Sequence, residues 1–166
     1  SRTGFYFAND ARTAQEVESD LTLRSEEAFR LMEELQEASP LFSRTGGVHN
    51  AGLATVEGGV DVVSTDIGRH NTLDKLYGHA LKHDVPLQER IVVFSGRISS
   101  EILLKVSKMG SPVLLSKSAP TALALEMADD LGITAAGFLR RTKMNVYTHA
   151  WRIVDLPDRE GGERVG

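Results

Sequence analysis

Glycine, arginine and hydroxyl side chains gather in four short segments of this sequence, and these residue types bind phosphate groups in proteins. The segments are residues 66–71, 95–99, 118–121 and 140–143. Glycine lets a phosphate approach the backbone closely, and the forked guanidinium of arginine donates two hydrogen bonds to phosphate oxygens. Positive charge is concentrated there by Arg69, Arg97, Arg140, Arg141 and Lys143. The pattern predicts a site for a polyanionic small molecule.

The four segments follow strand-like runs, and helices and strands alternate along the chain. Residues 91–94 and 113–115 are continuously apolar, as buried parallel strands are, and a third such strand is expected over 134–139. Residues 57–59 are typical of a tight turn between antiparallel strands over 51–56 and 60–64. Apolar spacing predicts helices over residues 25–40, 73–81, 102–109 and 120–131. The fold class is therefore α/β, with three αβα layers and a mostly parallel sheet that carries one antiparallel hairpin strand.

This fold would bring the four segments together, because ligands bind beyond the carboxyl ends of parallel strands. The first three segments also open helices, whose free N–H groups favour an anion. We expect residues 25–154 to form the core domain, with residues 1–24 as the remnant of a preceding segment. Residues 155–166 are expected to form a mobile tail.

Composition excludes several classes of protein. The 166 residues suit one domain, and 41% apolar with 25% charged side chains is typical of a globular chain. A net charge of −4 disfavours a general nucleic-acid binder. No apolar run approaches the roughly 18 residues that cross a bilayer, so we expect no membrane span and a cytoplasmic location. The absence of cysteine excludes disulfides, thiolate zinc sites and a cysteine nucleophile within these residues.

Histidines and one charged run have competing interpretations. His49 and His70 lie beside the glycine-bearing segments, where each is either a site residue or a capping residue. His79 and His83 have the i, i+4 spacing of a metal pair, but no third ligand is evident, so we interpret them as a solvated face. The charge run over residues 26–37 is interpreted as the solvated side of a helix that takes no part in binding.

Six ordered motifs resemble the formate dehydrogenase accessory sulfurtransferase family, FdhD. They are residues 42–51 (FSRTGGVHNA), 66–75 (DIGRHNTLDK), 95–101 (SGRISSE), 118–121 (SAPT), 137–140 (GFLR) and 145–148 (NVYT). The resemblance runs from about Leu31 to Arg152, and the second and third motifs are its most specific parts.

The resemblance implies a sulfur carrier. Members of this family accept persulfide sulfur from a cysteine desulfurase and pass it to the molybdenum (or tungsten) bis-molybdopterin guanine dinucleotide cofactor before that cofactor enters formate dehydrogenase. The resemblance also implies a cytidine-deaminase-like core and a homodimer. Because the chain has no cysteine thiolate, we expect no zinc. It places the cofactor-binding stretch on Phe138, Leu139, Arg140, Arg141, Thr142 and Lys143.

The other candidate cofactor-binding residues come from the remaining segments and the loop before residue 50. They are Gly46, Gly47, His49, Asp66, Gly68, Arg69, His70, Asn71, Ser95, Gly96, Arg97, Ser99, Ser118 and Thr121.

The absence of a cysteine thiol leaves two hypotheses about the function open. Members of the family carry a cysteine upstream of the helix at Leu31, and this chain has none. Because the chain opens on Ser1 rather than on Met, we expect the cysteine to lie on a segment outside these residues. The alternative is a cofactor-binding chaperone that transfers no sulfur. A zinc deaminase of related fold is excluded, because residues 95–99 offer none of the thiolates that hold its metal.

Overall fold

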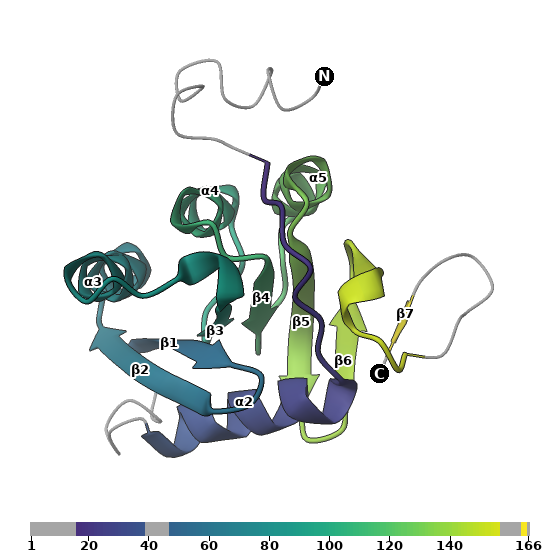
Figure 1. The fold of residues 1–166 in the computed structure, drawn as a ribbon, viewed down its shortest axis with the longest axis horizontal. Helices are drawn as coiled ribbons and strands as arrows, with labels where there is room; N and C mark the ends of the chain where they lie inside the picture. The colour runs from purple at the N-terminus through teal and green to yellow at the C-terminus, as the bar shows by residue number, and fades with distance from the viewer. Residues whose placement is uncertain (1–15, 39–46, 157–163, 166) are drawn as a thin grey trace.

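The computed structural model describes residues 16–38, 47–156 and 164–165, in which helices and strands alternate along most of the chain (Figure 1). The helices are α2 (Ser25–Ala38), α3 (Arg69–Lys82), α4 (Ser100–Met109) and α5 (Ala122–Leu131), with short 3-10 turns at Leu87–Glu89 and Ala150–Arg152. The strands are β1 (His49–Thr55), β2 (Gly59–Asp66), β3 (Ile91–Phe94), β4 (Val113–Ser116), β5 (Thr134–Arg140), β6 (Lys143–Val146) and β7 (Arg164–Val165).

The described strands form one mixed sheet in the order β2-β1-β3-β4-β5-β6-β7. Strands β3, β4 and β5 pair in parallel, as their apolar runs predicted, and β1 and β2 form the predicted antiparallel hairpin. The sheet is nevertheless more mixed than the mostly parallel arrangement expected, because β1 also pairs antiparallel with β3, and β6 and β7 add two antiparallel pairings. Only two residues separate β5 from β6, and so short a connection permits antiparallel pairing alone.

Helices cover both faces of the sheet, which confirms the three-layer αβα class (Figure 1). Alternate residues of a strand point to opposite faces, so Val92 joins the core beneath α3, α4 and α5, whereas Val93 joins the core beneath α2. Leu31 and Leu35 of α2 are buried against that second face. Within the described ranges, no helix combines the length and the apolar character needed to cross a bilayer.

The ends of α4 and α5 fix where the neighbouring loops begin and stop. The hydroxyls of Ser99 and Thr121 accept hydrogen bonds from N–H groups in the first turns of these helices. Gly110 and Gly132 end the helices with φ of 87° and 77°, a left-handed conformation that glycine adopts without strain.

The start of α2 depends on the other end of the chain. Asp155 accepts hydrogen bonds from the Ser25 backbone N–H at 2.7 Å and from the Ser25 hydroxyl at 2.9 Å. A carboxylate at a helix N-terminus also interacts favourably with the helix dipole. The expected domain limits stay a prediction, since residues 1–15, 39–46, 157–163 and 166 lie outside the described ranges.

Candidate functional site

Four predicted loops emerge at one edge of the sheet. Strands β3, β4 and β5 are parallel, so the loops after Phe94, Ser116 and Arg140 leave in the same direction. Strand β1 is antiparallel to β2 and to β3, so β2 points the same way as β3 and ends at Asp66 on this edge. The topological argument made from the sequence therefore holds for all four segments.

Hydrogen bonds tie neighbouring loops of this edge to one another. The Ser95 hydroxyl accepts from the Asn50 N–H at 2.9 Å, and the Ser118 hydroxyl donates to the Ser95 carbonyl at 3.1 Å. The Phe138 N–H in turn donates to the Ser118 carbonyl at 3.3 Å. These hydrogen bonds therefore connect the start of β1, the loops after β3 and β4, and the end of β5 at this edge of the sheet. Four candidate hydroxyls already form hydrogen bonds within the protein, those of Ser95, Ser99, Ser118 and Thr121. Their assignment as ligand contacts stays a prediction.

His49 and Arg69 stand at the starts of β1 and α3, and the charge of Arg69 acts on His49. His49 packs its ring against Phe94, with the ring centroids 6.1 Å apart. A Cβ atom on Gly96 would lie 3.0 Å from His49 Nδ1, so this approach of the β3 loop requires glycine. Burial, and then the positive charge of Arg69, lower the pKa of His49 below its ordinary value. Near neutral pH His49 is therefore an uncharged hydrogen-bonding group, and Arg69 carries the charge at this end of the edge.

Asp66 is held in place by its own surroundings. Its carboxylate accepts from Lys75 Nζ at 2.7 Å and from the Gly68 N–H at 2.9 Å. The hydrogen bond from Lys75 is the largest cause that lowers the pKa of Asp66, followed by the Gly68 N–H. Lys75 also donates to the Thr65 carbonyl at 3.1 Å. Asp66 therefore anchors the start of α3 as a carboxylate.

Replacing Lys75 with methionine should raise the pKa of Asp66 toward 3.8, because the main stabilising contact of the carboxylate is lost. With the lysine present, the folded-state pKa is the lower one, so Asp66 stabilises the fold above pH 3.8 and loses that contribution as pH falls through the folded-state value. Carboxyl NMR titration measures the shift. Lys108→Met, at an exposed lysine of α4, is the control, and equal Asp66 titration curves in both variants would contradict the assignment.

The structure separates His70 from the rest of the predicted site. His70 lines a cavity of about 380 Å³ between α3 and α4, with Leu73, Tyr77 and Leu104 as part of its apolar lining. Helix residues three and four positions apart share a face, as His70, Leu73, Asp74 and Tyr77 do along this cavity. Among the neighbouring candidates, Asn71 and Arg97 are exposed.

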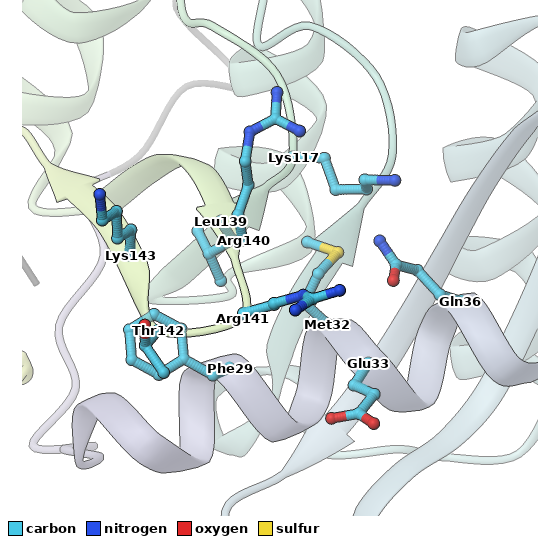
Figure 2. A pocket seen from close by; sticks show the side chains of 10 residues that line it. All are labelled: Phe29, Met32, Glu33, Gln36, Lys117, Leu139, Arg140, Arg141, Thr142 and Lys143. Atoms are coloured by element: carbon cyan, nitrogen blue, oxygen red, sulfur yellow. The ribbon is translucent and has the colours of Figure 1, made fainter.

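A groove forms between α2 and the β5–β6 hairpin (Figure 2). Its volume is about 840 Å³, and we call it the basic groove. It is lined by Phe29, Met32, Glu33, Gln36, Lys117, Leu139, Arg140, Arg141, Thr142 and Lys143. Five of the six residues in the predicted stretch from Phe138 to Lys143 therefore lie together.

The cations of the basic groove lack counter-ions. The side chains of Lys117, Arg140, Arg141 and Lys143 form no ion pair with any side chain in the described ranges. In Figure 2 Arg140 and Lys117 lie on the opposite side of the cavity from α2. Like charges so close together favour an anion among them. The groove suits a phosphate-bearing ligand.

The hairpin that presents these cations is conformationally unusual. Phe138 and Arg141 have φ of 55° and 41°, and the pairing of β5 with β6 shifts register between Gly137 and Arg140. Left-handed conformations at residues other than glycine cost free energy and are concentrated at functional sites. A Cβ atom at Gly137 would lie 2.8 Å from the Ser118 carbonyl oxygen. The hairpin is therefore packed tightly against the β4 loop.

Sequence reasoning missed the helical wall of the basic groove. Phe29, Met32, Glu33 and Gln36 of α2 belong to a run that we had interpreted as a solvated face with apolar residues turned inward. No local signal marks them, because the hairpin that they face lies more than 100 residues away along the chain. Lys117 could have been found, since it directly precedes the segment that starts at Ser118.

Two further candidates are the glycines of the loop before β1. Gly47 is exposed, with φ of 81°, beside the start of β1, and Gly46 lies outside the described residues.

In the part of the chain that the structure describes, no three His, Cys, Asp or Glu side chains are grouped as metal ligands. His79 and His83 stack at a centroid distance of 4.3 Å.

Comparison with known proteins connects this site to a family. A model of the FdhD/NarQ family matches residues 2–154. The chain is 56% identical over 150 residues to the sulfur carrier protein FdhD of Geobacillus kaustophilus, covering 90% of this chain and 57% of that protein. It is 57% identical over 154 residues to the sulfur carrier protein FdhD of Halalkalibacterium halodurans, covering 93% of this chain and 57% of the relative. The chain thus spans little more than half the length of these curated relatives.

Two solved structures share the fold. A proposed formate dehydrogenase accessory protein from Desulfotalea psychrophila superposes with a TM-score of 0.77 at 30% identity, over 86% of this chain and 62% of the other. A guanine deaminase from Nitrosomonas europaea superposes with a TM-score of 0.51 at 13% identity, over 79% of this chain and 85% of the other. The second match bears on the fold alone, and it confirms the predicted deaminase-like core.

Proposed function

Because the chain belongs to the FdhD/NarQ family, we propose that it forms the cofactor-binding core of a sulfur carrier that serves formate dehydrogenase. The whole protein would receive persulfide sulfur from a cysteine desulfurase. It would pass that sulfur to the molybdenum (or tungsten) bis-molybdopterin guanine dinucleotide cofactor before the cofactor is inserted into the dehydrogenase. In this proposal the cofactor is cargo and substrate, and a homodimer in the cytoplasm is the form expected to act.

The basic groove is the observation that carries the proposal. A guanine dinucleotide presents a pyrophosphate with two negative charges. Four cations that form no ion pair within the described ranges line one cavity of about 840 Å³. Lys117, Arg140, Arg141 and Lys143 would hold the phosphates, since charge-assisted hydrogen bonds to phosphate oxygens are among the strongest that side chains make. The net charge of −4 over the chain means that such binding must come from this local cluster.

Two groups of candidate residues lie apart at this edge of the sheet, and their separation supports two separate roles. The groove cations lie on the β5–β6 hairpin and the β4 loop. The uncharged His49 begins β1, which is two strand spacings from β4 and three from β5, about 10 and 14 Å, and Arg69 begins α3 just after β2. The connected loops between them keep the two groups at a fixed separation. We propose that the groove binds a nucleotide arm of the cofactor and that the His49 end faces the part of the cofactor where sulfur is received.

The sulfur-carrying thiol must come from elsewhere in the whole protein. These 166 residues contain no cysteine, and a persulfide needs a thiolate. The relatives are longer than this chain, which covers 57% of them, and that difference supports a cysteine on a further segment. The same absence favours one alternative, a chaperone that binds the cofactor and transfers no sulfur.

Persulfide detection on the whole protein separates these functions. After incubation with a cysteine desulfurase and cysteine, intact mass spectrometry should show a gain of one sulfur atom that a reductant removes. Replacing the cysteine concerned with serine should abolish the gain. A whole protein that contains no cysteine, or gains no sulfur while still binding the nucleotide, would establish the chaperone and reject the carrier.

A further inference from the structure

The cavity of about 380 Å³ between α3 and α4 is an apolar groove with a charge at each end. Leu73, Tyr77 and Leu104 form part of its lining. Glu101 lies in the first turn of α4 and Lys108 in its last turn, and both side chains are exposed. Neither forms an ion pair within the described ranges. The groove therefore suits an apolar segment that is flanked by one cation and one anion.

The chain contains such a segment before the first described residue. Phe5, Tyr6 and Phe7 are consecutive and make up three of the ten aromatic side chains of the chain. Arg2 precedes this run and Asp10 follows it. The FdhD/NarQ model matches from residue 2 onward, so the matched region includes the run. Because apolar surface is driven out of water, three adjacent aromatic side chains favour a position against an apolar surface of the protein.

The described chain begins within reach of the groove. Val17 is buried in the core beneath α3, α4 and α5, and its N–H donates to the Leu131 carbonyl at the end of α5 at 2.7 Å. Helix α4 packs against both α3 and α5, and neighbouring helices lie 8–10 Å apart, so the groove is about 15 Å from Val17. The nine residues from Ala8 to Val17 span up to about 30 Å when extended. The aromatic run therefore reaches the groove.

The topology also sets the direction in which the run would lie. Helices α4 and α5 each end before a parallel strand, so Lys108 and Val17 lie at the same edge of the sheet. A chain that leads back from Val17 enters the groove at Lys108 and leaves it at Glu101. Asp10 then comes to the end with Lys108, and Arg2 to the end with Glu101, so opposite charges meet at both ends.

The length of the groove matches that of an extended run. Glu101 and Lys108 are seven helical positions apart, which is about 10 Å along the helix axis. Residues 4–8, when extended, span about 13 Å. Alternate side chains of an extended segment point to opposite sides. Phe5 and Phe7 would then share one side, and Tyr6 would point the other way.

We propose that Phe5 and Phe7 dock in the groove between α3 and α4, with Tyr6 directed to solvent. Residues 1–4 then leave the groove at the end where His70 lies, next to Arg69. On the proposed function, this brings the start of the chain to the part of the sheet edge where sulfur is received. That consequence rests on the proposed function, whereas the docking itself does not.

Disulfide mapping tests the docking and its direction, because the chain has no cysteine of its own and introduced pairs are the only thiols. Gly4→Cys with Glu101→Cys, and Ala8→Cys with Lys108→Cys, should each form a disulfide within one molecule under mild oxidation. Ala8→Cys with Glu37→Cys is the control, since Glu37 lies on α2 at the other face of the sheet. Disulfides between two molecules would assign the groove to a second copy of the chain. That result, or matched pairs that form no more disulfide than the control, would overturn the proposal.

Substitution of the aromatic residues gives a second test with a matched control. Phe5→Ser with Phe7→Ser should lower the melting temperature by about 4–8 °C and speed the amide exchange of residues 101–109, because the groove loses its cover. Tyr6→Ser should lower the melting temperature by less than about 2 °C. Equal effects of the two changes would contradict the alternation of side chains on which the docking depends.

Binding of guanosine diphosphate separates this inference from the proposed function. All the serine variants should bind the nucleotide as the parent chain does, because the basic groove lies on the other side of the sheet edge, between α2 and the β5–β6 hairpin. A parent chain that forms the matched disulfides but binds no nucleotide would support the docking and count against the proposed function. Nucleotide binding without the matched disulfides would reject the docking alone.

Discussion

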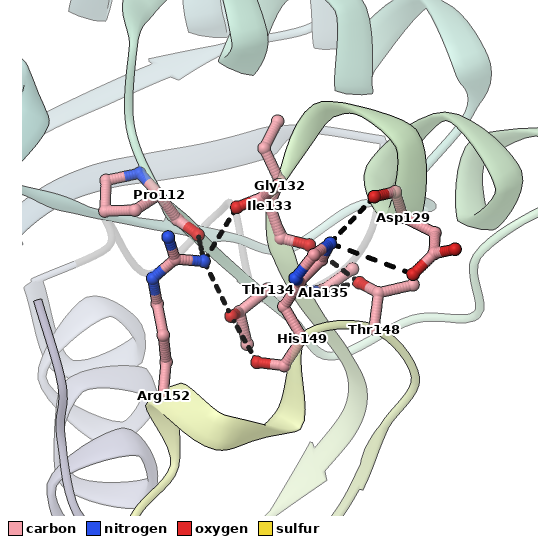
Figure 3. A network of polar contacts seen from close by, with 9 residues as sticks. All are labelled: Pro112, Asp129, Gly132, Ile133, Thr134, Ala135, Thr148, His149 and Arg152. Carbon is pink, nitrogen blue, oxygen red and sulfur yellow. Dashed lines mark hydrogen bonds and ion pairs between the residues drawn. The ribbon is translucent and has the colours of Figure 1, made fainter. Parts of the chain in front are cut away.

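Replacing Arg152 with leucine is expected to lower the free energy of unfolding by about 3 kcal/mol, the largest loss of stability that we expect from one side chain. Arg152 is only 2% exposed, and Figure 3 shows its guanidinium directed at Pro112, Gly132 and Thr134. Its Nη1 donates to the Gly132 carbonyl at 2.7 Å and to Thr134 Oγ1 at 3.2 Å, and its Nη2 donates to the Ser19 carbonyl at 3.1 Å. Leucine would leave these acceptors buried without donors.

The expected loss is large because this guanidinium joins segments that are distant in sequence. It connects the segment around Ser19 to the start of β5, and the Trp151 ring covers it at 4.2 Å. Urea denaturation and thermal melting would measure the effect, with an expected fall in melting temperature of roughly 6–12 °C. Arg97→Leu, at an exposed arginine, should change stability by less than about 0.5 kcal/mol. A loss below about 1 kcal/mol for Arg152→Leu would contradict this role.

Replacing both Arg140 and Lys143 with alanine is expected to weaken binding of guanosine diphosphate at least about a hundredfold. Each charge-assisted contact contributes roughly 1.5–3 kcal/mol, so each single variant should lose about ten- to a hundredfold in affinity. Both side chains are exposed at the rim of the basic groove, so their removal should leave the fold intact. Calorimetry would measure the affinities.

Salt provides a second test of that prediction. Added salt should weaken binding by the parent protein more than by the double variant, because fewer charges remain to be screened. Glu37→Ala serves as the control; Glu33, which the sequence marked as a solvated helix position, cannot serve because it lines the groove. Equal affinities in the parent protein, both single variants and the double variant would show that the cluster does not hold the phosphates.

The fold was largely predictable because its signals are local. Apolar spacing located α2 and the later helices, and the apolar runs at β3 and β4 marked buried strands. Strand β6 was missed for a physical reason. The turn before it, around Arg141 and Thr142, has neither glycine nor asparagine, and Arg141 itself takes the positive φ of 41°. A strained arginine gives no turn signal in the sequence.

The site was predictable only in part, because half of its wall comes from a distant element. Arg140, Arg141 and Lys143 were identified by their charge and by the resemblance, and the structure places all three in one groove. Glu33 carries no such signal, since only tertiary packing brings α2 to the hairpin. His70 was a candidate because it belongs to the segment 66–71, and in the structure it lines the cavity between α3 and α4.

Hydrogen–deuterium exchange with and without guanosine diphosphate tests most directly whether the basic groove is the nucleotide site. Ligand contacts should slow the exchange of backbone N–H groups in the β5–β6 hairpin around residues 139–143 and in the facing part of α2, residues 29–36. Residues 101–109, which line the cavity between α3 and α4, should exchange as before. Protection confined to the α3–α4 cavity, or none in the hairpin at a saturating nucleotide concentration, would contradict the account.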